Sequence, residues 1–164
     1  MMTRRFLLAG AAVGAVALAY GSRWWSQPSE AAETFEVTHT DAEWHKLLTP
    51  AQYDVLRKSD TEYPFTSKLL HEERAGIFAC AGCARELFSS ETKFDSKTGW
   101  PSFWEPLKDA VGTVTDGSYG MARTAVHCSR CGGHLGHVFD DGPKPTGLRY
   151  CMNGIAMTFK PNAA

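Results

Sequence analysis

The sequence lacks any run of basic residues. The charged residues of the first 31 positions are Arg4, Arg5, Arg23 and Glu30, and without them the 17 basic and 18 acidic residues fall to a net charge of −3. Binding nucleic acid through its phosphates needs clustered Lys and Arg side chains. A mildly acidic chain without such a cluster therefore excludes nucleic acid as the expected partner.

The sequence also lacks an apolar run long enough to cross a bilayer comfortably, which takes about 20 residues. Its N-terminus has Arg4 and Arg5 followed by a shorter apolar segment, the pattern of a signal peptide. The adjacent arginines resemble a twin-arginine export signal. We therefore expect residues 1–31 to be a twin-arginine-like signal peptide and the protein to be periplasmic. The alternative is an uncleaved membrane anchor with Trp24 and Trp25 at the interface.

Internal repeats and low-complexity tracts are absent, apart from one cysteine motif that occurs twice. We expect residues 32–39 to be a linker and residues 40–164 to form one domain. Two helix starts open this domain, because Thr40 begins a capping box and Thr49 stands directly before a proline. The apolar residues that follow each start have helical spacing, which predicts two short helices with ordinary core residues.

After Gly76 the sequence has no further helix-length periodic segment. Short apolar runs alternate instead with Gly, Pro, Asp and Ser, which is typical of strands joined by turns. The predicted strands include residues 77–79, 112–114, 122–126, 148–150 and 157–159. The expected fold class is therefore mainly β (α+β), with short N-terminal helices before an antiparallel β domain.

Cysteine is scarce, and four of the five cysteines form two Cys-x-x-Cys pairs, Cys80 with Cys83 and Cys128 with Cys131. Four thiolates around a tetrahedral ion are the arrangement of structural zinc, with no open position for substrate. Because 44 residues separate the pairs, one Zn²⁺ would join two distant hairpins. Two disulfides or a redox-active pair are the alternatives, but neither explains two pairs on similar turns.

The fifth cysteine, Cys151, has no partner in this count. A lone cysteine is more often a small buried apolar residue than a nucleophile. Here, however, Arg149 and Asn153 would project from the same face of a strand as Cys151. The guanidinium would favour a thiolate, and the amide could hydrogen-bond a reacting oxygen. His134 and His137 follow the second cysteine pair closely, and the four cysteines leave them free of the metal.

An ordered set of segments closely resembles the B-type peptide methionine-R-sulfoxide reductases, the methionine sulfoxide reductase B family. The resemblance covers about residues 40–160. Any one segment would be a weak signal, but the ordered set is highly specific. The segments are Gly99-Trp100-Pro101-Ser102-Phe103, Cys128-x-x-Cys131-Gly132, His134-Leu135-Gly136-His137-Val138-Phe139, Asp141-Gly142-Pro143, Pro145-Thr146-Gly147 and Arg149-Tyr150-Cys151-Met152-Asn153.

The resemblance implies two antiparallel β-sheets with one structural zinc ion on the side away from the active site. It implies an enzyme that reduces methionine-R-sulfoxide, free or in proteins, and so repairs oxidised proteins. It also assigns roles to side chains. The implied roles are a nucleophile at Cys151, sulfoxide-oxygen binding and proton supply by His134 and His137, orientation of this network by Arg149, Asn153 and Asp141, and a substrate-methyl wall at Trp100.

The sequence departs from the family pattern at one position. Many members carry a resolving cysteine just before the Gly-Trp-Pro-Ser-Phe segment, where this chain has Thr98. We therefore expect a sulfenic acid at Cys151 that an external reductant, a thioredoxin-like protein or a small thiol, must reduce. We also expect a monomer. The alternative function is a zinc-dependent binding module without chemistry, which would have no need for a free thiol at Cys151.

Overall fold

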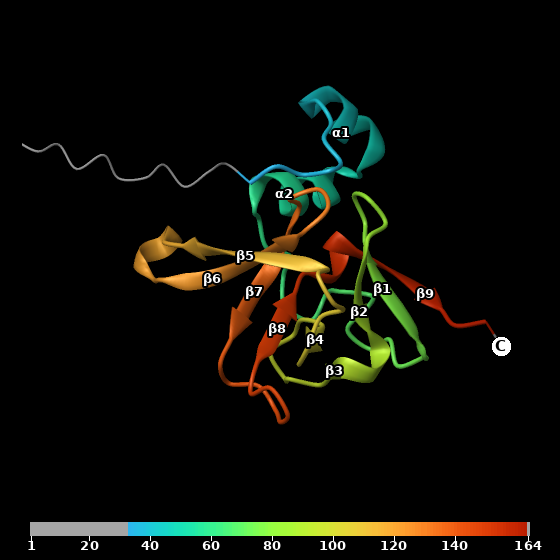
Figure 1. Ribbon diagram of the computed structural model, residues 1–164, viewed down its shortest axis with the longest axis vertical. Helices are drawn as coiled ribbons and strands as arrows, with labels where there is room; N and C mark the ends of the chain where they lie inside the picture. Colours follow the sequence, from blue (N-terminus) through green and yellow to red (C-terminus); the bar gives the residue numbers. More distant parts are fainter. Residues whose placement is uncertain (1–32, 164) are drawn as a thin grey trace, which may run out of the picture. The chain divides into compact units, whose positions relative to one another are not determined.

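The computed structural model describes residues 33–163 (Figure 1). The expected signal peptide, residues 1–31, lies outside the described residues. Within the described part of the chain, no helix combines the length and the apolar character needed to span a membrane.

Two short helices open the domain. Helix α1 spans Asp41–Leu47 and helix α2 spans Pro50–Lys58. Each begins with a complete capping box, in which the threonine at the N-cap accepts a backbone N–H and the residue three positions on closes the pair. Both helix starts predicted from the sequence are therefore confirmed.

The rest of the described chain forms two antiparallel sheets, as expected for a mainly β fold. The first sheet has the strand order β2-β1-β9 and the second the order β3-β4-β8-β7-β6-β5 (Figure 1). The strands are β1 (Gly76–Cys80), β2 (Glu86–Ser89), β3 (Lys93–Phe94), β4 (Ser102–Phe103), β5 (Val111–Asp116), β6 (Arg123–Cys128), β7 (His134–Phe139), β8 (Arg149–Met152) and β9 (Met157–Pro161).

The core lies between the two sheets and is rich in aromatic side chains. Phe103 of β4 stacks on Phe88 of β2, with ring centroids 4.4 Å apart, and meets the ring of Phe78 of β1 at 4.9 Å. All three side chains are fully buried. Burial of each contributes roughly 1.5–3 kcal/mol to the stability of the fold. This packing leaves the opposite face of the six-stranded sheet available for a site.

The predicted strands correspond to β1, β5, β6, β8 and β9, whereas β2, β3, β4 and β7 were not predicted. Strand β7 contains a glycine, which weakens a strand signal. Its close approach to β8 explains the glycine, because a Cβ at Gly136 would lie 2.2 Å from the carbonyl oxygen of Cys151. Gly136 therefore allows β7, the strand with both predicted histidines, to pair with β8. The same glycine made β7 difficult to predict from the sequence.

Residues 33–39, the described part of the expected linker, lie against the second cysteine turn. The backbone N–H of Val37 donates to the carbonyl of Arg130 at 3.0 Å. The guanidinium of Arg130 forms an ion pair with Glu36 at 2.9 Å. This segment therefore meets the domain through specific polar contacts beside the cysteines.

Candidate active site and metal centre

The two Cys-x-x-Cys turns meet where the sheets join. The first turn follows β1 and the second connects β6 to β7. The sulfur atoms of Cys80 and Cys131 lie 3.7 Å apart and those of Cys83 and Cys128 lie 3.5 Å apart, and all four lie within 4.8 Å of one another. These separations are too long for a disulfide, whose sulfurs lie about 2.05 Å apart. The four thiols form a candidate metal centre.

The donor set and its spacing fit Zn²⁺. Sulfur ligands about 2.3 Å from a tetrahedral ion lie just under about 4 Å from one another, which matches the pairs in this cluster. Helix α2 supports the cluster, because Arg57 donates a hydrogen bond to the carbonyl of Cys131 at 3.0 Å. Leu56 packs so close that a Cβ at Gly133 would meet its Cδ2 at 2.9 Å. The helices thus cover the cysteine turns.

Cys151 lies on β8, in the middle of the six-stranded sheet. Its direct neighbours across the strands are Ser102 on β4 and His137 on β7. Residues directly opposite in an antiparallel pair have Cβ atoms about 4.5–5.5 Å apart and share a face of the sheet. Tyr150 and Met152 pack into the core on the opposite face. The face alternation expected for this strand is confirmed.

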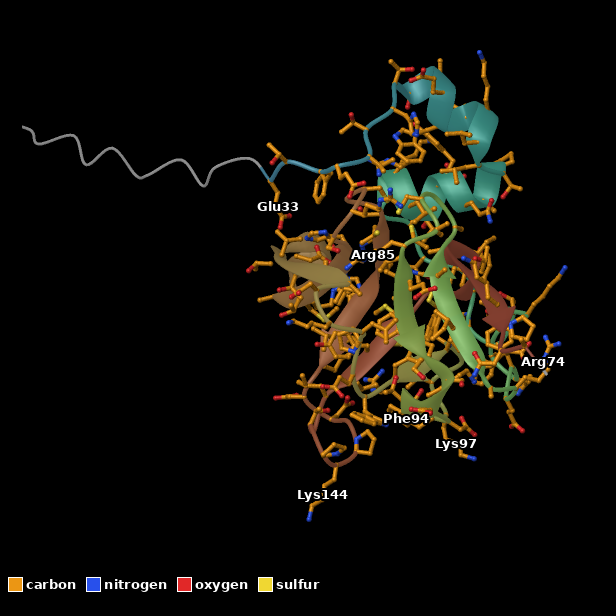
Figure 2. All side chains as sticks on the ribbon, turned by 45° about the vertical axis from the view of Figure 1, so that its right-hand side comes forward. Glu33, Arg74, Arg85, Phe94, Lys97 and Lys144 are labelled. Carbon is orange, nitrogen blue, oxygen red and sulfur yellow. The ribbon has the colours of Figure 1, made fainter. Side chains whose placement is uncertain are left out.

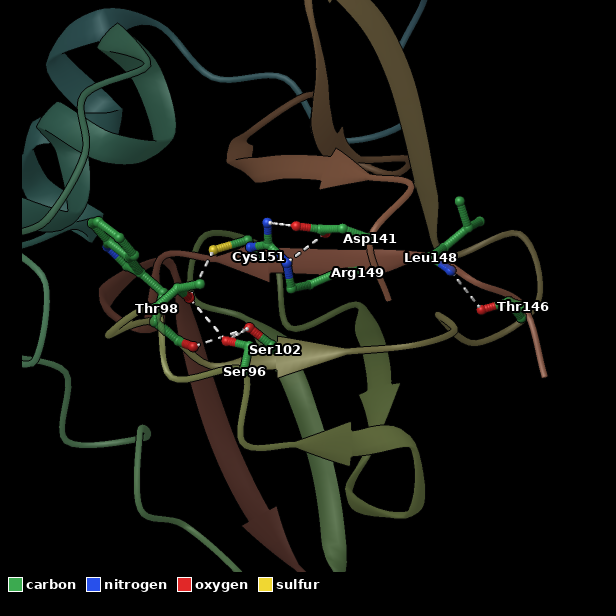
Figure 3. Close-up of polar contacts among 9 residues, drawn as sticks. Ser96, Thr98, Ser102, Asp141, Thr146, Leu148, Arg149 and Cys151 are labelled. Carbon is green, nitrogen blue, oxygen red and sulfur yellow. Dashed lines mark hydrogen bonds and ion pairs between the residues drawn. The ribbon is translucent and has the colours of Figure 1, made fainter. Parts of the chain in front are cut away.

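The surroundings of Cys151 act in opposite directions on its thiol. Burial raises the pKa of Cys151, while a hydrogen bond with Thr98 and the charge of Arg149 act to lower that pKa. Arg149 was expected from the sequence to favour the thiolate. Its charge does so here, but burial has the larger effect. The Thr98 hydroxyl lies 3.7 Å from the Cys151 sulfur (Figure 3).

Arg149 is held by a carboxylate from the loop between β7 and β8. Its Nε and Nη2 atoms donate to the two oxygens of Asp141, each at 2.8 Å (Figure 3). Bidentate pairs of this kind fix the plane of the guanidinium. The guanidinium also lies over the ring of Phe139, 4.4 Å from its centroid. Lys144 stands at the tip of the same loop (Figure 2).

The two predicted histidines lie side by side on β7. The ring centroids of His134 and His137 are 5.4 Å apart in an edge-to-face arrangement. Nε2 of His137 contacts a carboxylate oxygen of Asp116 at 2.8 Å, which orients the His137 ring. The buried Nε2 of His134 has no hydrogen-bond partner within the described part of the protein. Burial lowers the pKa of His134 to about 4, so this ring is neutral at pH 7.

A cavity of about 740 Å³ opens in front of the histidines. His134, His137 and Asp116 line it, and so do Glu33 and Phe35 from the segment that precedes α1. Among the described residues, Cys151 and Trp100 are not part of this lining. The cavity therefore lies on the side of the site formed by the histidines and Asp116.

Trp100 and Asn153 both form hydrogen bonds with Glu62, a residue that was not predicted from the sequence. The indole N–H of Trp100 donates to the carbonyl of Glu62 at 3.1 Å, and the backbone N–H of Glu62 donates to the side-chain oxygen of Asn153 at 3.0 Å. The Glu62 carboxylate accepts the backbone N–H groups of Gly154 and Ile155. Burial raises the pKa of this carboxyl. Glu62 thus connects two predicted site residues to the end of β8.

The amide of Asn153 was expected to face a reacting oxygen. In the structure this side chain is buried, and its nitrogen donates to the carbonyl of Leu135 at 3.1 Å. The amide therefore holds the backbone of β7 beside the backbone of residues 61–62.

Sequence reasoning missed Asp116 and Glu62 for different reasons. Asp116 ends β5 opposite Arg123 of β6, with which it forms an ion pair at 2.7 Å. A carboxylate at a strand end beside histidine-bearing strands is a signal that could have been used. Glu62 lies in an irregular segment between α2 and β1, and no periodicity or spacing marks it.

The fold and the site together define a β protein with a four-cysteine candidate metal centre. One further thiol lies outside this centre, beside two histidines and an arginine held by an ion pair. Residues 48–161 match the SelR domain family. By this match and by its relatives, the chain belongs to the family of the B-type peptide methionine sulfoxide reductases.

Three relatives illustrate how far the likeness extends, and each carries the name peptide methionine sulfoxide reductase MsrB. The protein of Leptospira interrogans is 52% identical over 127 residues, which cover 77% of this chain and 97% of the relative. The protein of Methanosarcina barkeri is 54% identical over 125 residues, covering 76% and 88%. That of Leifsonia xyli is 54% identical over 129 residues, covering 77% and 93%.

Proposed function

We propose that this protein reduces methionine-R-sulfoxide to methionine at Cys151 and thereby repairs oxidised proteins. The single observation that carries the proposal is the position of Cys151, directly opposite His137 in the sheet and outside the cysteine cluster. Its relatives share this chemistry by name, and the chain spans nearly their whole length.

The reaction begins at the Cys151 sulfur. The thiolate of Cys151 attacks the sulfoxide sulfur and forms an S–S bond to it, and the sulfoxide oxygen takes up one proton to become a hydroxyl group. The hydroxyl group then moves to the Cys151 sulfur as its bond to the substrate sulfur and the S–S bond both break. In the balance of the step, the oxygen passes to Cys151, the substrate gains two electrons and becomes methionine, and the thiol becomes a sulfenic acid. Sulfenic acid is the first and reversible product of thiol oxidation.

His137 is the better placed of the two histidines to supply a proton to the leaving oxygen. It stands opposite Cys151 in the ladder, and Asp116 orients its ring. His134 is neutral at pH 7 because burial lowers its pKa to about 4. Its unpartnered Nε2 is suited to a hydrogen bond with the sulfoxide oxygen or with a water molecule that carries it.

Arg149, Asp141, Asn153 and Trp100 shape the site rather than take part in bond making. The ion pair of Arg149 with Asp141 keeps a positive charge near the thiol, where it opposes the effect of burial. Trp100 would form the apolar wall for the substrate methyl group, and its hydrogen bond to Glu62 fixes the indole. Asn153 holds strand β7, and so the histidines, in register with this wall.

The four clustered cysteines would hold one structural Zn²⁺. Cys80, Cys83, Cys128 and Cys131 fill all four positions of a tetrahedral ion, so no position is left for substrate. When bound, the ion supplies cross-linking and no reaction chemistry. What these residues do for the reaction is to fix the turn from which β7 and its histidines start.

Regeneration of Cys151 requires an external reductant. The chain has five cysteines, and the other four form the cluster. Thr98, whose hydroxyl lies 3.7 Å from the Cys151 sulfur, cannot form a disulfide. A thioredoxin-like protein or a small thiol must therefore attack the sulfenic acid, which releases water and leaves a mixed disulfide with Cys151. A second thiol of the reductant then breaks this disulfide and frees the Cys151 thiol.

The test is turnover of each epimer of a dabsylated methionine sulfoxide with dithiothreitol as reductant. We expect loss of the R epimer and no loss of the S epimer, which serves as the internal control. Mass spectrometry of enzyme treated with substrate alone should find sulfenic acid at Cys151. Absence of R-epimer turnover by metal-loaded protein would instead favour a binding module.

We also propose that the protein is exported through a twin-arginine signal in residues 1–31 and acts as a monomer. The adjacent Arg4 and Arg5 before an apolar segment support the export signal. Fractionation of a C-terminally tagged protein should place it in the periplasm, and an unprocessed cytosolic product would contradict export. Sedimentation analysis of the mature protein tests its oligomeric state.

A further inference from the structure

Three hydroxyl groups form a continuous chain that ends at the Cys151 sulfur (Figure 3). The Thr98 hydroxyl lies 3.7 Å from the sulfur, the Ser96 hydroxyl lies 2.8 Å from that of Thr98, and the Ser102 hydroxyl lies 2.7 Å from that of Ser96. At its far end, Ser102 donates to the carbonyl of Trp100 at 3.1 Å. The chain thus connects the thiol with the backbone of the expected substrate wall.

The backbone is bent to bring these hydroxyls together. Ser96 and Thr98 lie in the connection between β3 and β4, on either side of Lys97, whose φ of 63° is left-handed. A left-handed residue other than glycine costs about 1 kcal/mol or more, and such strain gathers at functional sites. Ser102 is fully buried and stands directly opposite Cys151 on β4. The hydroxyls are therefore fixed in place relative to the sulfur.

The number of hydrogen atoms shows how the hydroxyl chain can hydrogen-bond both the thiol and the thiolate. With a neutral thiol, four hydrogens serve four contacts, because Cys151 donates to Thr98, Thr98 to Ser96, Ser96 to Ser102, and Ser102 to the Trp100 carbonyl. Once the thiol has lost its proton, all three hydroxyls can rotate and donate toward the sulfur. The contact given up is then the one between Ser102 and the Trp100 carbonyl. Chains of this kind strengthen one another's hydrogen bonds.

We propose that the Thr98 hydroxyl, supported by Ser96 and Ser102, donates a hydrogen bond to the Cys151 thiolate and so stabilises the reactive form of the thiol. This inference rests on the proposed function only in taking Cys151 as the nucleophile. Threonine at this position is then more than the absence of a resolving cysteine. It supplies a hydrogen bond where a second thiol would supply a disulfide.

The charged groups around Cys151 come from its own strand and from β7, and they leave a role for this hydrogen bond. Arg149 on β8 is positive but is paired with Asp141. His137 on β7 faces Cys151 and is paired with Asp116. Strand β4 on the other side contributes the uncharged Ser102. Burial raises the pKa of Cys151, and among the opposing contacts the Thr98 hydrogen bond has the largest effect, ahead of Arg149.

The experiment compares Thr98→Val with Thr98→Ser in the full-length, metal-loaded protein. The rate of Cys151 alkylation by iodoacetamide is measured against pH, with mass spectrometry reading the peptide that contains Cys151. A hydrogen bond to a charged group is the stronger kind, so Thr98→Val should raise the alkylation midpoint by about one pH unit and slow alkylation at pH 7 about tenfold. Thr98→Ser keeps the hydroxyl and should leave the midpoint close to that of the wild type.

Thr158→Val on β9 is the matched control, since Thr158 is exposed and belongs to the other sheet. An unshifted midpoint in folded Thr98→Val would overturn the proposal, and so would an equal shift in Thr158→Val. Alkylation needs no turnover, so the outcome is separate from that of the reductase assay. A protein that turns over sulfoxide with an unshifted midpoint refutes the hydroxyl chain alone, and an inactive protein with a shifted midpoint refutes the reductase alone.

A second measurement needs no folded variant. Metal-bound cysteines carry no S–H group, so the Raman S–H band of the metal-loaded wild type at neutral pH comes from Cys151. A thiol that donates to Thr98 should show this band below the frequency of a free thiol in water-poor surroundings. A band at the frequency of a free thiol would show that the chain does not engage the sulfur, and would overturn the proposal.

Discussion

The cysteine cluster and the Cys151 site show two uses of the same side chain in one domain. In the cluster, four sulfurs lie within 4.8 Å of one another, at the ends of strands and at turns. At the site, one sulfur lies within the sheet among hydroxyls, an arginine and a histidine. Only the first set can fill the four positions of a metal ion, and only the second leaves a sulfur outside the cluster. The surroundings of a cysteine therefore decide whether its role is structural or catalytic.

The largest expected effect is a complete loss of turnover at the Cys151 site with the cysteine cluster intact. Cys151→Ser should abolish turnover of methionine-R-sulfoxide, because a hydroxyl cannot replace the thiolate as nucleophile. Metal content and thermal unfolding should stay at wild-type values. The measurements are the dabsyl assay, metal analysis and a thermal melt. Residual turnover in this variant would move the nucleophile into the cluster and end the distinction between the regions.

The same substitution in the cysteine cluster tests its structural role. Cys128→Ser should lose the metal and lower the free energy of unfolding by roughly 5 kcal/mol, less than the roughly 10–16 kcal/mol that zinc contributes to small zinc-finger peptides. The effect is smaller here because the two sheets also share an apolar core. Denaturant unfolding with and without a chelator measures it. A stable, metal-free and active Cys128→Ser protein would show that the cluster is dispensable.

An intermediate loss of kcat is expected when the orientation of His137 is disturbed. Asp116→Asn keeps an oxygen near Nε2 of His137 but removes the charge that orients the ring. The value of kcat should fall about tenfold, which is less than the roughly 10²–10⁴-fold that proton transfer by a side chain contributes in full. The matched control is Asp140→Asn, an exposed residue just after β7. Equal kcat values for the two variants would remove His137 from the list of proton donors.

The smallest expected change in rate comes from Thr98→Cys. With dithiothreitol as reductant the rate should stay within about tenfold of the wild type, the range expected of a single lost hydrogen bond to a charged sulfur. The product should differ, because the Thr98 side chain is close enough to Cys151 for a disulfide to form after turnover. Non-reducing peptide mapping detects it, with Thr158→Cys as a control that should form none. A free sulfenic acid in Thr98→Cys would contradict this geometry.

The sequence predicted the two regions unequally. The cluster was predicted in full, because two Cys-x-x-Cys pairs carry their chemistry in their spacing, and both helix starts were predicted from local capping signals. The face on which Cys151 lies followed from strand alternation. Each of these features depends on residues that are near one another in the chain.

What the sequence could not supply depends on contacts between distant segments. Burial decides the direction in which the pKa of Cys151 moves, and burial belongs to the whole sheet. Glu62 acts through backbone groups as much as through its carboxylate, so its identity says little about its role. Strand β7 escaped notice because of Gly136, whose purpose is visible only when Cys151 of the next strand lies against it.

The row of residues across the six-stranded sheet has a consequence for how the protein matures. Ala125, His137 and Cys151 stand side by side on three consecutive strands, but Ser102 completes the row from β4, much earlier in the chain, so its pairing with Cys151 is non-local. Such non-local pairings form late and slowly during folding. Until the last strand is in register, Cys151 is an ordinary thiol in an open chain. Catalytic activity should therefore appear late in folding, and the onset of turnover during refolding would report when the sheet is complete.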